Sequence, residues 1–394
     1  MTLPVITLKS GKEQSLNRFH PWVFSGAVKY ISRELEEGEL VQIVSNKKDF
    51  LAIGHFQIGS IAVRIISFED SPIDEDFWTR KLSDAVQLRR DLGLLGSEHT
   101  NVFRLIHGEG DGMPGLIIDY YNGTAVYQAH SVGMYPIRHE LAKILKKIMG
   151  DSLNAVYDKS EKTLPFKADI NPENGYILES SEPCVVKEYD LSYQVDWISG
   201  QKTGFFIDQR ENRKLVEQYS NGRDVLNMFC YSGGFSFFAL QGGAKLVHSV
   251  DSSVKAIELT KQNVELNFKN DERHEAFVAD AFDFMREIKD RYNLIVLDPP
   301  AFAKHRGALR PALQAYKRIN AKAFEQIRPG GILFTFSCSQ VVSKDKFREA
   351  VFSAAAISGR KVRILHQLHQ PADHPINIYH PEGEYLKGLV LYVD

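Results

Sequence analysis

The sequence predicts an α/β protein whose C-terminal part contains a parallel sheet covered by helices on both faces. From about residue 190 onward, apolar runs typical of buried strands alternate with helical segments, a pattern that favours βαβ units. Two of these runs lead into reactive side chains: 294–297 is followed by Asp298, and 330–335 is followed closely by Cys338. Ligands bind at the carboxyl ends of strands in open α/β sheets, so we expect the functional site at this edge.

The composition is that of an ordinary globular protein. The chain has 394 residues, of which 43% are hydrophobic and 25% are charged, and its formal net charge is −2. This charge excludes a global basic field that would attract nucleic acid, so any RNA contact must come from local patches. The length is sufficient for two or three domains.

The cysteines and the N-terminus favour a reducing cytoplasm. Cys184, Cys230 and Cys338 are too few and too scattered for a disulfide framework or a zinc site, and no metal is expected. The N-terminus lacks a signal-peptide pattern, and no stretch reaches the roughly 18 apolar residues of a membrane span. We therefore expect a cytoplasmic protein without a membrane partner.

Residues 1 to about 70 are expected to form a small barrel of short strands. The runs that carry this prediction lie between turn signals at 5–8, 22–24, 40–44, 50–54 and 61–66. A helix is predicted from about Asp74. Its apolar stripe, at steps of four, three, three and four residues, is Trp78, Leu82, Ala85, Leu88 and Leu92.

The middle of the chain is expected to be a separate α/β domain. Strands over 103–106 and 116–118 flank a glycine-rich loop, and a helix is predicted over 137–149. We place the next boundary between 170 and 195. The predicted domains are therefore 1–70, 71–188 and 189–394.

The last domain shows strands and helices in regular alternation. The expected strands are 225–229, 245–250, 276–279, 294–297 and 330–335, and a glycine turn followed by an apolar helix comes after the first. The final runs, 362–365 and 389–393, are joined without an obvious helix. We therefore expect an antiparallel pair to complete the sheet.

The glycine turn and the acids at the strand ends predict a cofactor containing a nucleoside. Such a turn lets a ligand approach the backbone, and the helix behind it presents free N–H groups. Asp251 suits the two ribose hydroxyls, and Asp280 suits an adenine amino group. The full G-x-G-x-x-G pattern and a hydride-transfer apparatus are both absent, so S-adenosylmethionine is favoured over a dinucleotide; a non-binding α/β domain is the structural alternative. The neighbours expected at the same site are Phe229, Tyr231, Ser232, Gly233, Ser252 and Ala281.

Asp298 and Cys338 suit covalent chemistry on a pyrimidine base. Carbon 5 of cytosine is too poor a nucleophile to take a methyl group directly, whereas addition of a thiolate at carbon 6 creates an enamine-like intermediate that can. We predict Cys338 as the nucleophile and Asp298 as the acid near ring nitrogen 3, with no assignment for the final base. An unperturbed thiol is only a few per cent ionised at neutral pH, so the site must favour the thiolate or rely on intrinsic reactivity. The structural alternatives are a solvated Asp298 in a rigid turn and a Cys338 that packs as a small hydrophobe.

With these residues, the chain resembles the bacterial 23S rRNA cytosine-C5 methyltransferases that carry an N-terminal PUA domain. The segments that carry the resemblance are RFHPWVF (18–24), GEGDGMPGL (108–116), KTGFFIDQR (202–210), DPPAF (298–302), FSCS (336–339) and YHPEGEYLKG (379–388). The resemblance implies a PUA domain, a central α/β domain and a Rossmann-like, seven-stranded methyltransferase domain. It also implies Cys338 as the attacking thiol. It places Gln209 and Arg210 against the cofactor together with Asp251, Asp280 and Asp298.

One position departs from the wider pattern of cytosine-C5 RNA methyltransferases. Many of them carry a second cysteine just after the first proline of the Asp-Pro motif, where it serves product release. In this chain Pro300 and Ala301 occupy that place. The departure leaves the chemistry of release open.

Basic residues on two segments are expected to contact RNA. Lys304, Arg306 and Arg310 follow the Asp298 motif and suit phosphates near the reacting base, with a solvated helix face as the alternative. Arg18 and His20 suit RNA contacts in the N-terminal barrel.

The expected partner is 23S rRNA or a large-subunit assembly intermediate. The target cytosine should be unpaired or flipped out, because an enzyme cannot reach it inside a helix. The sequence does not determine the oligomeric state, and a homodimer stays open. Two rival functions also stay open: a guanine-nitrogen methyltransferase without a covalent step, and a non-catalytic RNA-binding assembly factor.

Overall fold

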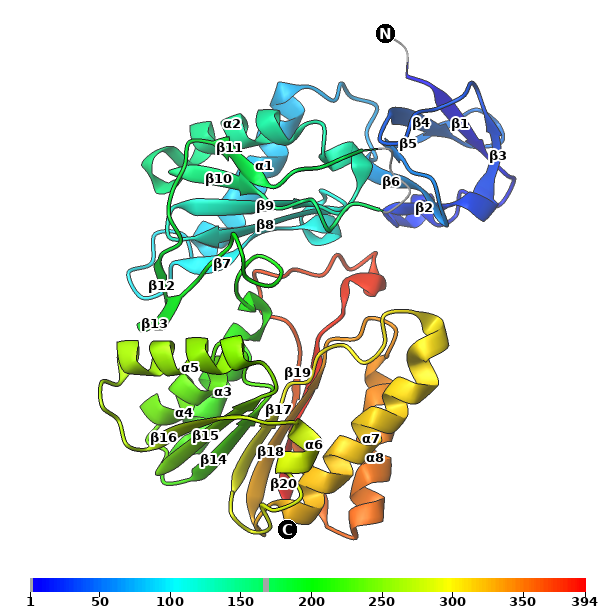
Figure 1. The fold of residues 1–394 in the computed structure, drawn as a ribbon. Helices are drawn as coiled ribbons and strands as arrows, with labels where there is room; N and C mark the ends of the chain where they lie inside the picture. The colour runs from blue at the N-terminus through cyan, green and yellow to red at the C-terminus, as the bar shows by residue number, and fades with distance from the viewer. Residues whose placement is uncertain (1–2, 166–169) are drawn as a thin grey trace. The chain divides into compact units, whose positions relative to one another are not determined.

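A computed structural model describes residues 3–165 and 170–394, which separate into two units. The first unit consists of the described residues within 1–186, 195–205 and 372–383, and the second of 187–194, 206–371 and 384–394 (Figure 1). The first unit contains two separate sheets. The division into domains 1–70, 71–188 and 189–394 stays a proposal, in which these two sheets belong to different domains.

The first sheet is the expected small barrel, seen as a curled six-stranded sheet (Figure 1). The strands, in the order β2-β6-β5-β4-β1-β3, are β1 (Val5–Leu8), β2 (Trp22–Phe24), β3 (Val28–Ile31), β4 (Leu40–Val44), β5 (Phe50–Phe56) and β6 (Ile61–Ser67). Buried apolar side chains such as Ile6, Val41 and Val63 form its own core. The sequence analysis missed β3, because no residue of this short strand is fully buried and the apolar pattern is weak.

The second sheet of this unit is covered by two helices, α1 (Glu75–Asp91) and α2 (Arg138–Met149) (Figure 1). Its strands, in the order β11-β10-β9-β8-β7, are β7 (Val102–His107), β8 (Leu116–Tyr121), β9 (Thr124–Ala129), β10 (Ala155–Asp158) and β11 (Gly175–Leu178). The predicted helix begins where expected: the Asp74 carboxylate caps it by accepting a hydrogen bond of 3.0 Å from the Phe77 N–H. Trp78 and Leu82 of the predicted stripe are buried.

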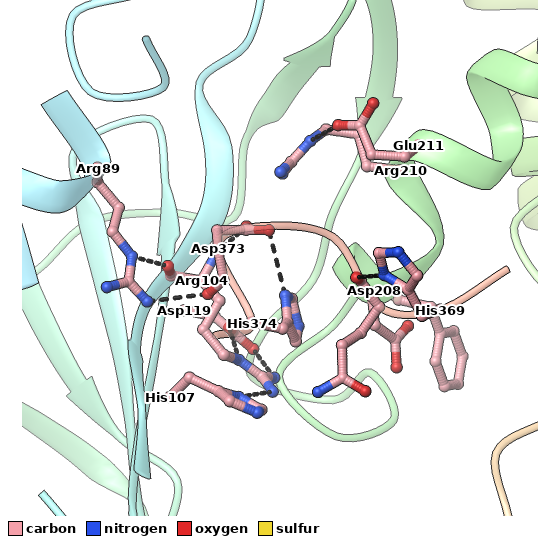
Figure 2. Close-up of polar contacts among 12 residues, drawn as sticks. Arg89, Arg104, His107, Asp119, Asp208, Arg210, Glu211, His369, Asp373 and His374 are labelled. Carbon is pink, nitrogen blue, oxygen red and sulfur yellow. Dashed lines mark hydrogen bonds and ion pairs between the residues drawn. The ribbon is translucent and has the colours of Figure 1, made fainter. Parts of the chain in front are cut away.

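A late segment of the chain, 372–383, is built into the first unit. The Asp373 carboxylate accepts a hydrogen bond of 2.8 Å from the Arg104 main-chain N–H, and the Asp373 carbonyl accepts one of 2.8 Å from the Arg89 guanidinium (Figure 2). Arg89 is fully buried and also binds both carboxylate oxygens of Asp111, at 2.6 and 2.8 Å. Local sequence patterns do not predict that 372–383 belongs to the first unit, since Arg89 and Asp373 are 284 positions apart.

The second unit contains the predicted parallel sheet. Its strands, in the order β16-β15-β14-β17-β18-β20-β19, are β14 (Asp224–Met228), β15 (Leu246–Asp251), β16 (His274–Val278), β17 (Leu294–Leu297), β18 (Gly331–Ser337), β19 (Val362–Leu368) and β20 (Lys387–Val393). The strands from β14 to β18 are parallel, whereas β20 is antiparallel to β18 and to β19. The expected antiparallel end of the sheet is thereby confirmed.

Helices cover both faces of this sheet, as predicted. The helices α3 (Arg210–Ser220), α4 (Gly234–Gln241) and α5 (Val254–Asn267) lie on one face (Figure 1). The helices α6 (Ala281–Phe284), α7 (Leu309–Gln326) and α8 (Lys344–Ser358) lie on the other. A two-stranded sheet, β12 (Val185–Glu188) and β13 (Leu191–Gln194), precedes them in the chain.

All three cysteines are free thiols. In the ranges that the structure describes, no group of three or more His, Cys, Asp or Glu side chains could hold a metal ion. None of the helices described is long and apolar enough to cross a bilayer.

Candidate functional site

The second unit brings the predicted cofactor and catalytic positions to one edge of its sheet. Because β14 to β18 are parallel and paired in register, their carboxyl ends meet there. The glycine turn follows β14, and the other strands end at or just before Asp251 (β15), Asp280 (β16), Asp298 (β17) and Cys338 (β18).

The turn between β14 and α4 has an unusual backbone. Phe229, Tyr231 and Gly233 all have positive φ, of 60, 47 and 86°. A Cβ added to Gly233 would lie 2.7 Å from the Phe237 ring and 2.8 Å from the Thr260 methyl group, so a glycine is required there. Ser232 is buried within the turn. The close packing at Gly233 therefore fixes the backbone of the turn between β14 and α4.

Asp251 is fixed beside this turn by two main-chain donors. Its Oδ2 accepts a hydrogen bond of 3.1 Å from the Tyr231 N–H, and its Oδ1 accepts one of 2.9 Å from the Ser253 N–H. The side chain of Tyr231 is held in turn by an edge-on contact with the Phe206 ring, at 5.0 Å. A carboxylate has about four acceptor positions, so the half-buried Asp251 retains capacity for ligand hydroxyls. Ser252 is exposed beside it.

Asp280 has a structural role that the sequence analysis did not foresee. Its Oδ1 accepts hydrogen bonds from the Phe282 and Asp283 N–H groups, at 2.8 and 3.1 Å, and thereby caps the short helix α6. Ala281 is buried directly behind it, whereas Asp280 itself is exposed. Both hydrogen bonds of the cap use Oδ1, so the cap and a ligand contact through Oδ2 are compatible.

Gln209 and Arg210 are both buried where a short 3-10 helix, Ile207–Gln209, meets α3. The Gln209 Oε1 accepts a hydrogen bond of 2.6 Å from Asn212, and the Arg210 Nε lies 3.2 Å from the Glu211 carboxylate (Figure 2). The start of α3 borders the glycine turn, because a Cβ on Gly234 would lie 2.9 Å from the Arg213 Cδ.

The loops that carry Asp298 and Cys338 are joined to each other. Both side chains are half-buried. The Ala303 N–H, which lies five residues beyond Asp298, donates a hydrogen bond of 3.2 Å to the Ser339 Oγ, which is next to Cys338. The structure thus places the predicted acid and the predicted nucleophile on two loops that contact each other.

Tyr316 of α7 is a residue of this site that the sequence analysis missed. Its hydroxyl lies 2.9 Å from the Ser337 Oγ and 3.1 Å from the Ser339 Oγ, on either side of Cys338. Its ring packs against Phe302, with centroids 4.7 Å apart. Burial raises the pKa of the Tyr316 hydroxyl, and the negative charge of an ionised Cys338 raises it further, so the hydroxyl stays protonated. In the sequence, only Ser337 and Ser339 beside Cys338 indicate a polar contact at this place, because no pattern in the α7 sequence distinguishes Tyr316 from other helix residues.

The other two thiols are held in the protonated form. Burial raises the pKa of Cys230 to about 12, and its Sγ lies 3.6 Å from the Thr260 Oγ1. Burial also raises the pKa of Cys184. Packing roles therefore suit both residues.

The predicted RNA contacts fall in both units. Lys304, Arg306 and Arg310 are exposed and follow the Asp298 loop into α7 of the second unit. Arg18 is exposed in the first unit, and His20 is half-buried there. The His20 ring is already used within the first unit, because its Nδ1 accepts a hydrogen bond of 3.2 Å from the Trp22 N–H.

Comparison with known families gives matches over most of the chain. The pattern of a family described as S-adenosylmethionine-dependent methyltransferase matches residues 104–379. The pattern of a PUA-like domain matches residues 6–68, which hold the first sheet.

Similar proteins cover the chain from end to end. Three of them, from Tolumonas auensis, Alteromonas mediterranea and Erwinia tasmaniensis, are each named Ribosomal RNA large subunit methyltransferase I. The first is 39% identical and covers 98% of both chains. The second is 38% identical with the same 98% coverage, and the third is 38% identical over 100% of both chains.

Solved structures share the fold over the full length. A structure described as a methyltransferase complexed with SAH superposes with a TM-score of 0.86 at 22% identity, covering 99% of this chain and 100% of the other. A structure from Streptococcus mutans, described as a SAM-dependent methyltransferase, superposes with a TM-score of 0.84 at 21% identity and the same coverage.

Proposed function

The chain belongs to the S-adenosylmethionine-dependent methyltransferases and carries a PUA-like domain, and from this premise we propose that it methylates carbon 5 of a cytosine in large-subunit (23S) ribosomal RNA. The proposed reaction passes through a covalent bond between the Cys338 sulfur and carbon 6 of the base. The observation that carries the proposal is the junction of the Asp298 and Cys338 loops at the carboxyl edge of the sheet, where Ala303 binds Ser339.

The residues at this edge fit S-adenosylmethionine. The glycine turn leaves no room for a side chain at Gly233, and Asp251 is anchored beside it with acceptor capacity to spare. Asp251 would bind the ribose hydroxyls, and Asp280 would accept from the adenine amino group. The residues that would line the remainder of the cofactor are Gln209, Arg210, Phe229, Tyr231, Ser232, Gly233, Ser252, Ala281 and Asp298. When bound, the cofactor supplies an electrophilic methyl group.

The chain's own residues prepare the base to accept that methyl group. The Cys338 thiolate forms a bond to carbon 6, and the electron pair of the ring double bond moves to make carbon 5 nucleophilic. Asp298, as the protonated carboxylic acid, donates a hydrogen bond near ring nitrogen 3 and stabilises the negative charge that develops there. After methylation, loss of the carbon 5 proton to a base restores the double bond and expels the Cys338 thiolate.

An RNA substrate agrees with the distribution of exposed cations. Lys304, Arg306 and Arg310 lie just beyond the Asp298 loop and would bind phosphates near the flipped cytosine. Arg18 and His20 would contact RNA from the PUA-like domain. The proposal leaves two forms of the substrate open, 23S rRNA and a large-subunit assembly intermediate, and leaves a homodimer open as well; a cytoplasmic location belongs to the same proposal.

The proposal is tested by the identity of the methylated nucleoside. The protein is incubated with unmodified 23S rRNA and labelled S-adenosylmethionine, and the RNA is then digested for nucleoside mass spectrometry. We expect 5-methylcytosine. Methylguanosine would support the non-covalent alternative, and RNA binding without any transfer would support the assembly-factor alternative.

Asp251 should control affinity for the cofactor. Loss of hydrogen bonds to a charged acceptor costs about 1.5–3 kcal/mol, so Asp251→Ala should weaken S-adenosylmethionine binding about ten- to hundredfold in isothermal titration calorimetry. The affinity of Asp251→Asn for S-adenosylmethionine should lie between those of the wild type and Asp251→Ala, since asparagine keeps an acceptor but removes the charge. Glu275→Gln, on the exposed surface of β16, is the control and should bind as the wild type does. Unchanged affinity in Asp251→Ala would exclude the ribose assignment.

A further inference from the structure

Lys387 is a buried cation on the strand next to Cys338. It is the first residue of β20 and pairs in register with Ser337, the last residue of β18. Its side chain is 5% exposed, and its Nζ donates hydrogen bonds of 2.6 Å to the main-chain carbonyls of Ser339 and Val342. Lys387 therefore binds both ends of the turn that begins immediately after Cys338.

The two carbonyls leave the ammonium group with further capacity. An ammonium group has three N–H donors, and the two bonds to the turn use two of them. A lysine is rarely buried without a charged partner, because its desolvation is costly. The printed contacts of Lys387 place its ammonium group at the turn that follows Cys338, and a negative charge on Cys338 favours the charged form of this amine.

The charges around Lys387 come from several elements. Cys338 follows β18, and Glu384 precedes β20; both favour the charged amine. The positive charge of Lys344, at the start of α8, disfavours the charged form of the Lys387 amine. The Tyr316 hydroxyl of α7 stays protonated and so carries no charge. Burial outweighs these effects and lowers the pKa of Lys387 to about 8. The amine is therefore mostly protonated at neutral pH and loses its charge as the pH rises through about 8.

We propose that Lys387 is a positioning residue for the methyl transfer, holding the turn at Cys338 and stabilising the thiolate form of that side chain through its adjacent positive charge. A neighbouring cation is a general way in which proteins favour a reactive thiolate. This inference rests on the proposed function of Cys338 as the nucleophile. It also supplies what a covalent mechanism requires, because an unperturbed thiol is largely un-ionised at neutral pH.

The test measures ionisation of the Cys338 thiol without methyl transfer. The wild-type protein is treated with iodoacetamide across a pH series, and the rate for each cysteine is read from its own peptide by mass spectrometry. The midpoint is the pH at which the alkylation rate of a cysteine is half its maximum. For Cys338 we expect this midpoint to lie below the pKa of roughly 8.5 of an unperturbed thiol. Lys387→Met should raise this midpoint by about one unit or more, and lower the alkylation rate at pH 7 about tenfold. Lys387→Arg, which keeps the charge, should stay near the wild type.

Lys344→Met is the matched control. Lys344 lies near Lys387 but is about half exposed and paired with Glu384, so its charge is screened by solvent. We expect a midpoint close to that of the wild type. Circular dichroism and thermal unfolding establish that each variant is folded before its midpoint is compared.

The outcomes separate this inference from the proposed function. A wild-type midpoint at or above about 8.5 would overturn the inference without any variant. A folded Lys387→Met with an unshifted midpoint, or a folded Lys387→Arg that shifts as much as Lys387→Met, would also overturn it. In either case the proposed function still stands if the wild type produces 5-methylcytosine and Cys338→Ala does not.

Discussion

Cys338→Ala is expected to abolish formation of 5-methylcytosine, with a loss of at least about 10³-fold in the rate of methyl transfer. The loss should be this large because carbon 5 of cytosine has no other route to sufficient nucleophilicity once the sulfur is removed. The substitution also deletes little volume at a half-buried position that follows the end of β18, so the fold should persist. The rate is measured with labelled S-adenosylmethionine and 23S rRNA, and the product by nucleoside mass spectrometry.

Cys184→Ala is the control for this prediction. Cys184 is half-buried in the first unit, and burial raises the pKa of its thiol, so it should neither attack the base nor affect transfer. S-adenosylmethionine binding by Cys338→Ala should match that of the wild type, because the cofactor contacts are proposed at the other strand ends. If Cys338→Ala retains most of its activity, the covalent mechanism is wrong and Cys338 is a packing residue.

The positions of the site along the seven-stranded sheet of the second unit could be predicted from sequence because they depend on short-range patterns. Continuous apolar runs identify the strands of a buried parallel sheet, and the residue after each run then lies at the carboxyl edge. Asp251, Asp298 and Cys338 were all placed in this way, and the structure puts them at that edge. The antiparallel end, β19 and β20, was expected for a similarly local reason: the absence of a helical pattern between the two runs.

What the sequence analysis missed depends on contacts between distant segments. Tyr316 approaches Cys338 from α7, and Lys387 approaches from β20, and each looks like an ordinary helix or strand residue in its local sequence. The Asp280 cap was missed for a different reason. An acid after a strand fits a ligand site and a helix cap equally well, and only the hydrogen bonds of α6 reveal that Asp280 caps this helix. The contacts of Asp373 with Arg89 and Arg104 likewise have no local signature.

A buried ion pair between Arg213 and Glu188 should contribute strongly to the stability of the second unit. The Arg213 Nε and Nη2 donate hydrogen bonds of 2.6 and 2.7 Å to the two Glu188 carboxylate oxygens, and Nη1 donates one of 3.0 Å to the Phe206 carbonyl. The two side chains are 3% and 0% exposed. The pair joins β12 to α3, whose first turn borders the glycine turn.

Arg213→Met should therefore lower the free energy of unfolding of the second unit by about 3–5 kcal/mol, because it leaves the Glu188 charge buried without its partner. Exposure of the buried Cys230 thiol to a thiol reagent in urea reports on this unit, whereas Trp22, Trp78 and Trp197 all report on the first.

Two further variants identify the cause of the destabilisation. Arg286→Met breaks an exposed pair with Asp283, whose side chains are 71% and 67% exposed, and should cost no more than about 1 kcal/mol. The double variant Arg213→Met with Glu188→Met removes both charges and should recover much of the lost stability, since an apolar pair of similar volume has no charge to desolvate. A double variant as unstable as Arg213→Met alone would show that packing and the bond to the Phe206 carbonyl, rather than the unpaired carboxylate, account for the loss.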